Sequence, residues 1–131
     1  MEQSVTQVIE SCAAASLEGS RNFGESVGDL LRAGVESYHA DFRSETTVWY
    51  LPDAAPVNTA LPAPAQAIAN GFDAGLLLTA IRGSQRGELK YRQFLVHARA
   101  AGCVGYIVWL SGRHVTYFGR RGEQHIERFP D

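Results

Sequence analysis

Apolar residues near the start of the chain recur with helical spacing. Over residues 4–17 they return every three or four positions, and Ser4 can act as the N-cap. Gly19 and Ser20 interrupt this pattern. The spacing resumes from Asn22 and stops at Gly34, a residue suited to the left-handed position after a helix. The pattern predicts two amphipathic helices in succession.

The pattern then changes to the alternation typical of β-strands. Residues 35–43 and 46–51 are rich in β-branched and aromatic side chains, and Ser44-Glu45 separates them. This arrangement predicts a β-hairpin with a two-residue turn. Residues 57–61 alternate weakly and stop at Pro62, so on their own they favour a loop.

The second half of the chain repeats this order 68 positions later, residue 101 standing for residue 33. It predicts helices over about 73–85 and 90–101 and a hairpin over 104–118. Residues 125–130 alternate clearly, so their counterparts at 57–62 are also interpreted as a closing strand. The identical pairs at this offset are few: Ser16 and Ser84, Gly19 and Gly87, Ala33-Gly34 and Ala101-Gly102, Tyr38 and Tyr106, Pro62 and Pro130. The interpretation depends on helix ends, turns and the final proline falling at equivalent positions.

We therefore predict an α+β fold. It is a two-layer sandwich from a tandem ααβββ repeat, in which helices cover one face of an antiparallel sheet. The chain is expected to form a single domain, residues 1–131, with repeat units of about 1–63 and 69–131. The stretch at 62–71, rich in proline and alanine, connects the two units.

Strand alternation sorts the hairpin residues onto two faces. The face expected beneath the helices is almost wholly apolar: Tyr38, Ala40, Phe42, Thr47, Trp49, Leu51, Val104, Tyr106, Val108, Leu110, Val115 and Tyr117. The opposite face is mixed: Val35, Ser37, His39, Asp41, Arg43, Thr46, Val48, Tyr50, Gly105, Ile107, Trp109, Ser111, His114, Thr116 and Phe118. Aromatic groups on an uncovered face usually meet a ligand, another chain or a connector.

Composition and charge narrow the possible functions. The 131 residues, 45% of them hydrophobic, suffice for one folded domain without disulfides or a metal. Twelve basic against fourteen acidic residues, a net charge of −2, argue against non-specific DNA binding and against an acidic DNA mimic. Cys12 and Cys103 have no metal-ligand spacing and predict small buried thiols. The amino terminus does not resemble a signal peptide and no apolar run is long enough to span a membrane, so we expect a cytoplasmic protein without membrane contact.

One candidate for chemistry combines a histidine with a carboxylate. His39 and Asp41 project from the same strand face, about 7 Å apart by the strand rise. They could form an oriented base, or with His114 a metal site, if the two hairpins pack side by side. The plainer interpretation is a solvated sheet face on which Asp41 pairs with Arg43 or with a neighbouring strand.

A second candidate is aromatic. Tyr50, Trp109 and Phe118 could form a platform that stacks bases, sugars or flat ligands. Burial beneath the connector or in a homodimer interface is the alternative. Single-stranded nucleic acid is not the expected partner, because few lysines and arginines lie nearby in the sequence.

A third candidate is the glycine-flanked turn at 119–125. Its adjacent Arg120 and Arg121, with the turn amides, could hold a phosphate or carboxylate. The alternative is an exposed turn between two strands. The sequence contains no serine nucleophile elbow and no phosphate-binding or dinucleotide-binding fingerprint. We therefore expect no cofactor and assign no catalytic residue.

Three stretches, residues 34–52, 79–94 and 100–130, resemble the YbcV/YdfO-like family of small bacterial and prophage proteins. The resemblance implies an α+β two-layer fold. It implies no catalytic residue, since the family is a domain of unknown function often labelled "phage envelope protein". The chain departs from the family at Ser44-Glu45, where a Ser-Gly turn is commoner, and in its connector. These departures bear on the turn geometry and on the strand at 57–61.

The sequence as a whole favours a non-enzymatic binding or interaction module whose mixed sheet face meets a protein or small ligand. The contact surface would include His39, Asp41, Arg43, Tyr50, Trp109, His114 and Phe118. The alternative is a small metal-dependent hydrolase that uses His39, Asp41 and His114.

Overall fold

The helices and strands follow one another in the order ααβββααβββ. The computed structural model describes residues 4–130. Residues 1–3 and 131, which the predicted repeat units include at their ends, lie outside this range. The elements are α1 (Val5–Glu18), α2 (Phe23–Ala33), β1 (Ser37–Asp41), β2 (Thr46–Leu51), β3 (Ala54–Ala60), α3 (Ala74–Gln85), α4 (Tyr91–Ala100), β4 (Cys103–Trp109), β5 (His114–Gly119) and β6 (Gln124–Arg128).

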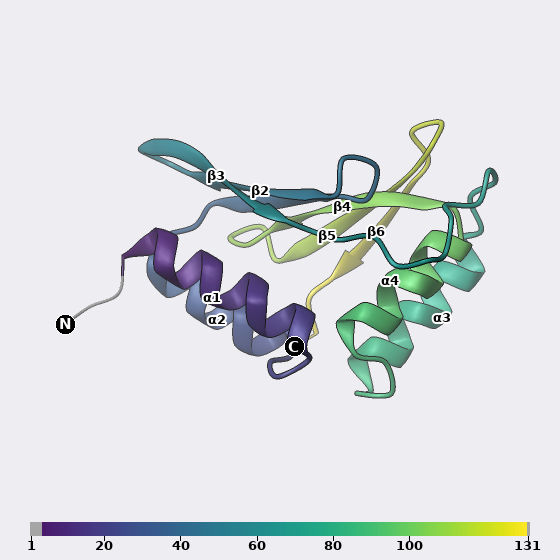
Figure 1. Ribbon diagram of the computed structural model, residues 1–131, viewed down its shortest axis with the longest axis horizontal. Coiled ribbons are helices and arrows are strands. Elements are labelled where there is room, and N and C mark those ends of the chain that lie inside the picture. The colour runs from purple at the N-terminus through teal and green to yellow at the C-terminus, as the bar shows by residue number, and fades with distance from the viewer. Residues whose placement is uncertain (1–3, 131) are drawn as a thin grey trace.

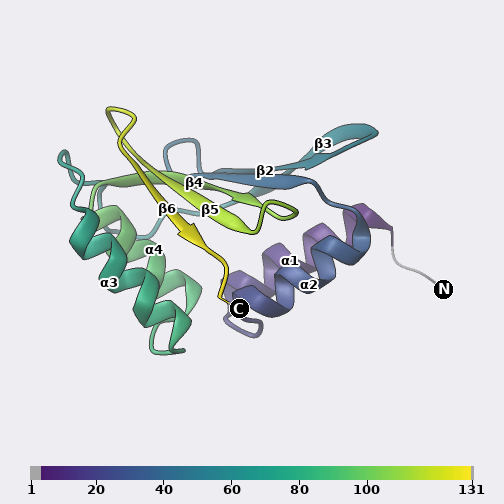
Figure 2. The same ribbon diagram turned by 180° about the vertical axis from the view of Figure 1, so that it is seen from behind.

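The six strands form one antiparallel sheet in the order β3-β2-β1-β4-β5-β6. Strands β1 and β4 join the two halves, with Tyr38 opposite Val108 and His39 opposite Ile107. All four helices lie on one side of this sheet, α1 with α2 and α3 with α4 (Figure 1). The view from behind shows the same two layers (Figure 2). The predicted α+β sandwich with helices on one face is confirmed.

Local sequence determines where the helices begin and end. Ser4 and Asn22 each accept a hydrogen bond from the backbone N–H three residues on, closing a capping box at α1 and α2. Asp73 caps α3 in a similar way. Gly19 and Gly34 end α1 and α2 with positive φ angles of 77° and 87°. These boundaries agree with the predicted helices to within one or two residues.

The first hairpin turn differs from the prediction. A two-residue turn at Ser44-Glu45 is wrong, because pairing stops at Asp41 and Thr46 and leaves four residues, 42–45, in the turn. Glu45 closes it with a φ of 57°. The second turn, 110–113, has the same length and closes at Arg113 with a φ of 58°. The two left-handed residues stand 68 positions apart (113 against 45), so the turns are equivalent.

Residues 57–61 overlap the edge strand β3, which pairs with β2 through Trp49 and Val57. The expectation of a strand, which came from the repeat, is confirmed for residues 57–60. From there the chain crosses to α3, and hydrogen bonds to both halves hold its path. The Ala63 N–H donates to the Glu45 carboxylate of the first half at 2.9 Å. Ala69 donates to the carbonyl of Arg99, and Asp73 donates to that of Ala101.

The core lies between sheet and helices. Every residue predicted for the covered face is buried except Leu51, which is partly buried. Val35 was predicted on the opposite face, and this prediction is wrong. It is 3% exposed and belongs to this core, because it precedes β1 and does not follow the strand alternation. Cys12 and Cys103 are both buried free thiols, as predicted.

Candidate functional site

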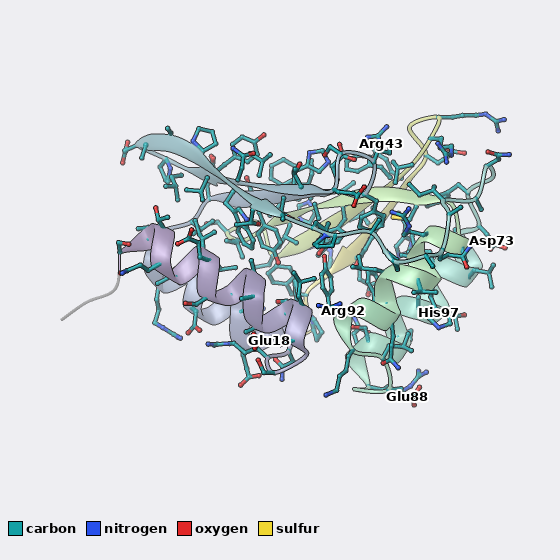
Figure 3. The ribbon with its side chains drawn as sticks, viewed as in Figure 1. Glu18, Arg43, Asp73, Glu88, Arg92 and His97 are labelled. Carbon is teal, nitrogen blue, oxygen red and sulfur yellow. The ribbon has the colours of Figure 1, made fainter. Side chains whose placement is uncertain are left out.

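The helix-free side of the sheet, called the open face below, carries the residues predicted to contact a partner. The strand registers place Val48, His39, Ile107, Thr116 and Ile126 in one row across five strands. The next row holds Tyr50, Ser37, Trp109, His114 and Arg128. Arg43 and Ser111, predicted on this face, lie in the hairpin turns. Arg43 projects from its turn in Figure 3.

Part of the open face is closed to solvent. Ser37 and Thr116 are 5% and 7% exposed, although no helix covers them. Ser37 sits between Tyr50 and Trp109 in its row, and Thr116 accepts a hydrogen bond from the Trp109 indole at 3.2 Å. The large aromatic neighbours therefore shield the small residues between them.

His39, Asp41 and His114 are not brought together. His39 and His114 lie on β1 and β5 with β4 between them and in different rows, roughly 12 Å apart by ordinary sheet spacings. Asp41 accepts hydrogen bonds from the backbone N and side-chain Nε of Arg43, at 3.0 and 3.2 Å. Burial would raise the pKa of Asp41, but these bonds lower it overall. Across residues 4–130 no group of three or more His, Cys, Asp or Glu side chains could hold a metal ion.

The three aromatic residues of the predicted platform are spread over the open face. Phe118 lies beside His39, with ring centroids 6.4 Å apart, and Trp109 lies beside His114 at 6.3 Å. Tyr50 and Trp109 are separated by the column of β1. The face therefore presents two histidine–aromatic pairs, with Tyr50 and Trp109 each 39% exposed.

The arginines of the 119–125 turn have different surroundings. The Arg120 guanidinium donates to the carbonyls of Ile68 and Ala69, at 3.0 and 3.3 Å, and so holds the connector. The backbone N–H of Arg121 donates to the Glu123 carboxylate at 2.8 Å. The turn thus contains a carboxylate, and one of its two guanidinium groups binds the connector.

A second candidate site lies on the covered side of the sheet. A cavity of about 930 Å³ lies between the sheet and the two helix pairs, and every helix and strand contributes to its lining. The helix pairs approach each other at one end, where Arg92 of α4 donates to the carbonyl of Leu17 at 2.6 Å. Glu18 and Arg92 mark this place in Figure 3. The cavity therefore lies between the sheet and the two converging helix pairs and is open to solvent at its rim.

Four tyrosines line the cavity: Tyr38, Tyr91, Tyr106 and Tyr117. The hydroxyls of Tyr91 and Tyr106 share a hydrogen bond of 2.6 Å. Within residues 4–130 the hydroxyls of Tyr38 and Tyr117 have no hydrogen-bond partner in the protein. They can therefore bond a bound molecule.

Burial keeps these tyrosines protonated. It raises the pKa of Tyr91 to about 12, and it raises the pKa of Tyr38, Tyr106 and Tyr117 well above the ordinary value. Each phenol therefore keeps its proton at neutral pH, and Tyr38 and Tyr117, whose hydroxyls have no partner within residues 4–130, can donate a hydrogen bond to an acceptor in the cavity.

Trp49 adds a flat wall to this cavity. Its ring stacks on Tyr38 with centroids 4.3 Å apart, and its indole N–H donates to Thr59 at 2.9 Å. Both rings are fixed on adjacent strands, because Tyr38 and Trp49 are register partners. The aromatic surface is thus formed before any ligand arrives.

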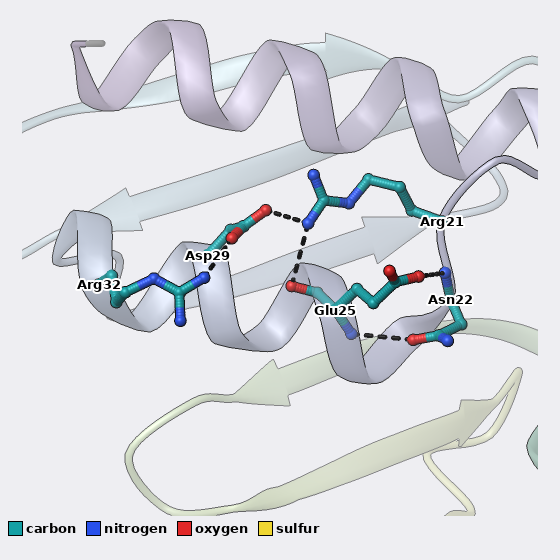
Figure 4. Close-up of polar contacts among 5 residues, drawn as sticks. All are labelled: Arg21, Asn22, Glu25, Asp29 and Arg32. Atoms are coloured by element: carbon teal, nitrogen blue, oxygen red, sulfur yellow. Dashed lines mark hydrogen bonds and ion pairs between the residues drawn. The ribbon is translucent and has the colours of Figure 1, made fainter. Parts of the chain in front are cut away.

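The rim of the cavity is polar and includes the loop between α1 and α2. Arg21 pairs there with Asp29, which also binds Arg32, and Asn22 and Glu25 form the capping box of α2 (Figure 4). On the side of the last strand, Arg113 lies over the Phe129 ring at 5.7 Å, and Phe129 meets Phe23 edge-on at 5.4 Å. Aromatic and cationic groups therefore border the cavity together.

The sequence did not predict this cavity. Tyr38, Tyr106, Tyr117 and Trp49 were assigned to the core, and their burial confirms that assignment. The available signal was the repeat, which places Tyr38 and Tyr106, and likewise Ser16 and Ser84, at equivalent positions; all four line the cavity. The space itself depends on how far apart the helix pairs lie, and residue spacing does not record that distance.

Comparison with known proteins gives a family without an assigned activity. Uncharacterised proteins of Mycobacterium bovis and Mycobacterium tuberculosis are each 38% identical to the chain over 58 residues, 44% of this chain and 35% of each relative. The chain thus spans about a third of the length of the curated relatives it matches. No helix among residues 4–130 is long and apolar enough to cross a membrane. Residues 4–127 match a family described as "Protein of unknown function (DUF1398)", and the chain therefore belongs to that family.

Proposed function

We propose that the protein is a non-enzymatic binding module that takes a small, mainly apolar ligand into the cavity between the sheet and the helix pairs. The observation that carries this proposal is the aromatic cavity of about 930 Å³. Sites for small molecules are typically concave spaces of 300–1,000 Å³, lined by apolar and aromatic groups with a few polar atoms. Trp49 and the tyrosines supply the apolar surface, and the free hydroxyls of Tyr38 and Tyr117 supply the polar atoms.

The experiment uses N-phenyl-1-naphthylamine, an uncharged aromatic dye whose fluorescence rises when it leaves water. Titration of the protein should give saturable binding. Ser16→Phe places a large ring on the cavity wall and should weaken that binding by about five-fold or more, because it occupies the space the dye needs. Ala14→Phe is the matched control, since Ala14 is exposed on the same helix and does not line the cavity.

Two results would contradict the proposal. In one, the dye fails to bind the wild-type protein. In the other, Ser16→Phe and Ala14→Phe bind it equally well, with both variants shown to be folded by circular dichroism. The second result would place the dye elsewhere on the surface.

A second candidate is self-association through the open face, and the exposure of two central aromatic residues favours it. Tyr50 and Trp109 are each 39% exposed on either side of β1. A second copy of the chain would cover both residues. Trp109→Ala should then lower the dimer fraction in sedimentation velocity runs, whereas Leu76→Ala, 54% exposed on α3, should leave it unchanged. A wild-type protein that stays monomeric at high concentration would contradict this candidate.

The narrower expectations from the sequence belong to the same proposal. They are a YbcV/YdfO-like, prophage-type origin, a cytoplasmic location, and a protein or small ligand as partner in place of nucleic acid. The YbcV/YdfO resemblance of residues 34–52, 79–94 and 100–130 supports the origin. The near balance of basic and acidic residues supports the choice of partner.

A further inference from the structure

Charge is distributed unevenly around the cavity. Residues 4–130 contain twelve basic side chains, and four of them line the cavity: Arg21, Arg86, Lys90 and Arg113. Arg128 also borders the cavity, but its register with His114 places its side chain on the open face. The same range contains twelve acidic side chains, fourteen in the chain less Glu2 and Asp131, and two of them line it: Glu25 and Glu127. A chain with a net charge of −2 therefore borders its cavity with a surplus of positive charge.

Both acidic groups already have partners. Glu127 accepts hydrogen bonds from Arg82 at 2.7 Å and from His125 at 3.3 Å. Glu25 accepts from the backbone N–H of Asn22 at 3.0 Å, as part of the capping box. Neither carboxylate therefore pairs with Lys90 or Arg113 on the rim.

Two of these cations, by contrast, pair with no carboxylate. Arg21 pairs with Asp29 and Arg86 with Glu88, but Lys90 and Arg113 form no ion pair within the described residues. Both are exposed, and Arg113 is held over the Phe129 ring at the rim. An apolar interior with unpaired cations at its border suits a molecule that is apolar along its body and negatively charged at one end.

We infer that the ligand of this cavity is an amphipathic organic acid. Its apolar body lies among Trp49 and the tyrosines, and its acid group meets one of the two unpaired cations at the rim, Lys90 or Arg113. The inference rests on the proposed function, because it names the ligand class of the same cavity. It goes further in requiring that the negative charge contribute to binding.

Octanoate and 1-octanol distinguish binding of the apolar body from a contribution of the negative charge. They share the same chain of eight carbons, and at pH 7 only octanoate is charged. Without the cations, the alcohol should be the better ligand, because moving a charge out of water is costly. Each compound displaces N-phenyl-1-naphthylamine from the wild-type protein, and the concentration for half displacement is compared. We expect octanoate to act at a concentration lower by about five-fold, the order given by one exposed ion pair.

In the double variant Lys90→Gln/Arg113→Gln, octanoate and 1-octanol should displace the dye at about the same concentration, or 1-octanol should act at the lower one. Arg121→Gln is the control, since Arg121 is exposed and does not line the cavity. A second measurement needs no substitution: the octanoate preference of the wild-type protein should shrink as sodium chloride is raised, because salt screens exposed charges.

The outcomes are distinguishable. If the dye, octanoate and 1-octanol all fail to bind, the proposed function itself fails. If 1-octanol competes as well as octanoate, or if the preference survives both the double variant and salt, the cavity binds apolar molecules but the inference of an acid ligand is overturned.

Discussion

Trp49 and Trp109 lie on opposite faces of the same sheet, and each indole N–H donates a hydrogen bond to a threonine. Trp49 bonds Thr59 at 2.9 Å, and Trp109 bonds Thr116 at 3.2 Å. Trp49 is 5% exposed beside the cavity, whereas Trp109 is 39% exposed on the open face. Since the chain has two tryptophans, each candidate surface contains its own natural reporter.

The hydroxyl pair of Tyr91 and Tyr106 should stabilise the contact between α4 and β4. Tyr91→Phe or Tyr106→Phe removes one partner of a 2.6 Å bond and leaves the other hydroxyl without it. Each change should lower the free energy of unfolding by about 1 kcal/mol, and the double variant should lose less than the sum. Urea denaturation measures this, with Tyr50→Phe as an exposed control. Strictly additive losses would show that the two hydroxyls do not interact.

Gly34 and Gly102 are equivalent glycines with different surroundings. Both have positive φ, 87° and 83°. A Cβ at Gly34 would meet no atom within 4 Å, but at Gly102 it would lie 2.0 Å from the Gly71 carbonyl oxygen. Gly34→Ala should cost about 1 kcal/mol for the backbone conformation. Gly102→Ala should cost about 1–3 kcal/mol more, because the connector must move. Equal losses in urea denaturation would mean that the connector does not press on this turn.

The ion pairs of Glu127 should make stability depend on pH. Burial would raise the pKa of Glu127, but hydrogen bonds from Arg82 and His125 lower it below the ordinary value. A lowered pKa in the folded state stabilises the protein above the unfolded pKa, and this stabilisation disappears as pH falls through the folded pKa. Glu127→Gln should therefore cost about 1 kcal/mol at pH 7 and progressively less below about pH 4.5.

The control for Glu127 is Glu18→Gln, because Glu18 is exposed and forms no ion pair among the described residues. Thermal unfolding of both variants from pH 3 to 8 would decide the point. If the difference between wild type and Glu127→Gln grew as the pH fell, the sign of the linkage would be wrong.

The adjacent arginines of the 119–125 turn provide a matched pair. Arg120 donates to two carbonyls of the connector, so Arg120→Gln should speed amide hydrogen exchange in residues 66–70 by several-fold, on the order expected for losing about 1 kcal/mol of local stability. Arg121→Gln should leave that exchange unchanged. A phosphate titration followed by NMR tests the competing prediction of an anion site: shifts confined to the turn and lost in Arg121→Gln would favour it.

Much of the fold could be predicted because local signals and the repeat agree. Alternation placed Tyr38 and Trp49 on the buried face, and the glycines at 19 and 34 end their helices as expected. The turn at 42–45 could not be located from alternation alone. Phe42 keeps the buried phase of the strand, and its N–H bonds the Val104 carbonyl, yet it has left the β1–β2 pairing.

The sites were harder to predict, because they depend on residues far apart in the sequence. The Arg120 contact with the connector spans 52 positions, and nothing in the turn itself indicates it. The histidines at 39 and 114 fall in different rows only once the order of strands is known. The cavity depends on the distance between the helix pairs, and the pattern of residues along the sequence does not contain that distance.

The most direct test of ligand binding in the cavity is an NMR titration of the two indole N–H signals, assigned with Trp49→Phe and Trp109→Phe. Octanoate and 1-octanol are added separately to the labelled wild-type protein. Binding in the cavity should shift the Trp49 signal with either compound and leave the Trp109 signal in place, since the sheet separates the two rings. A shift of the Trp109 signal alone, or displacement of the dye without any change at Trp49, would contradict the account.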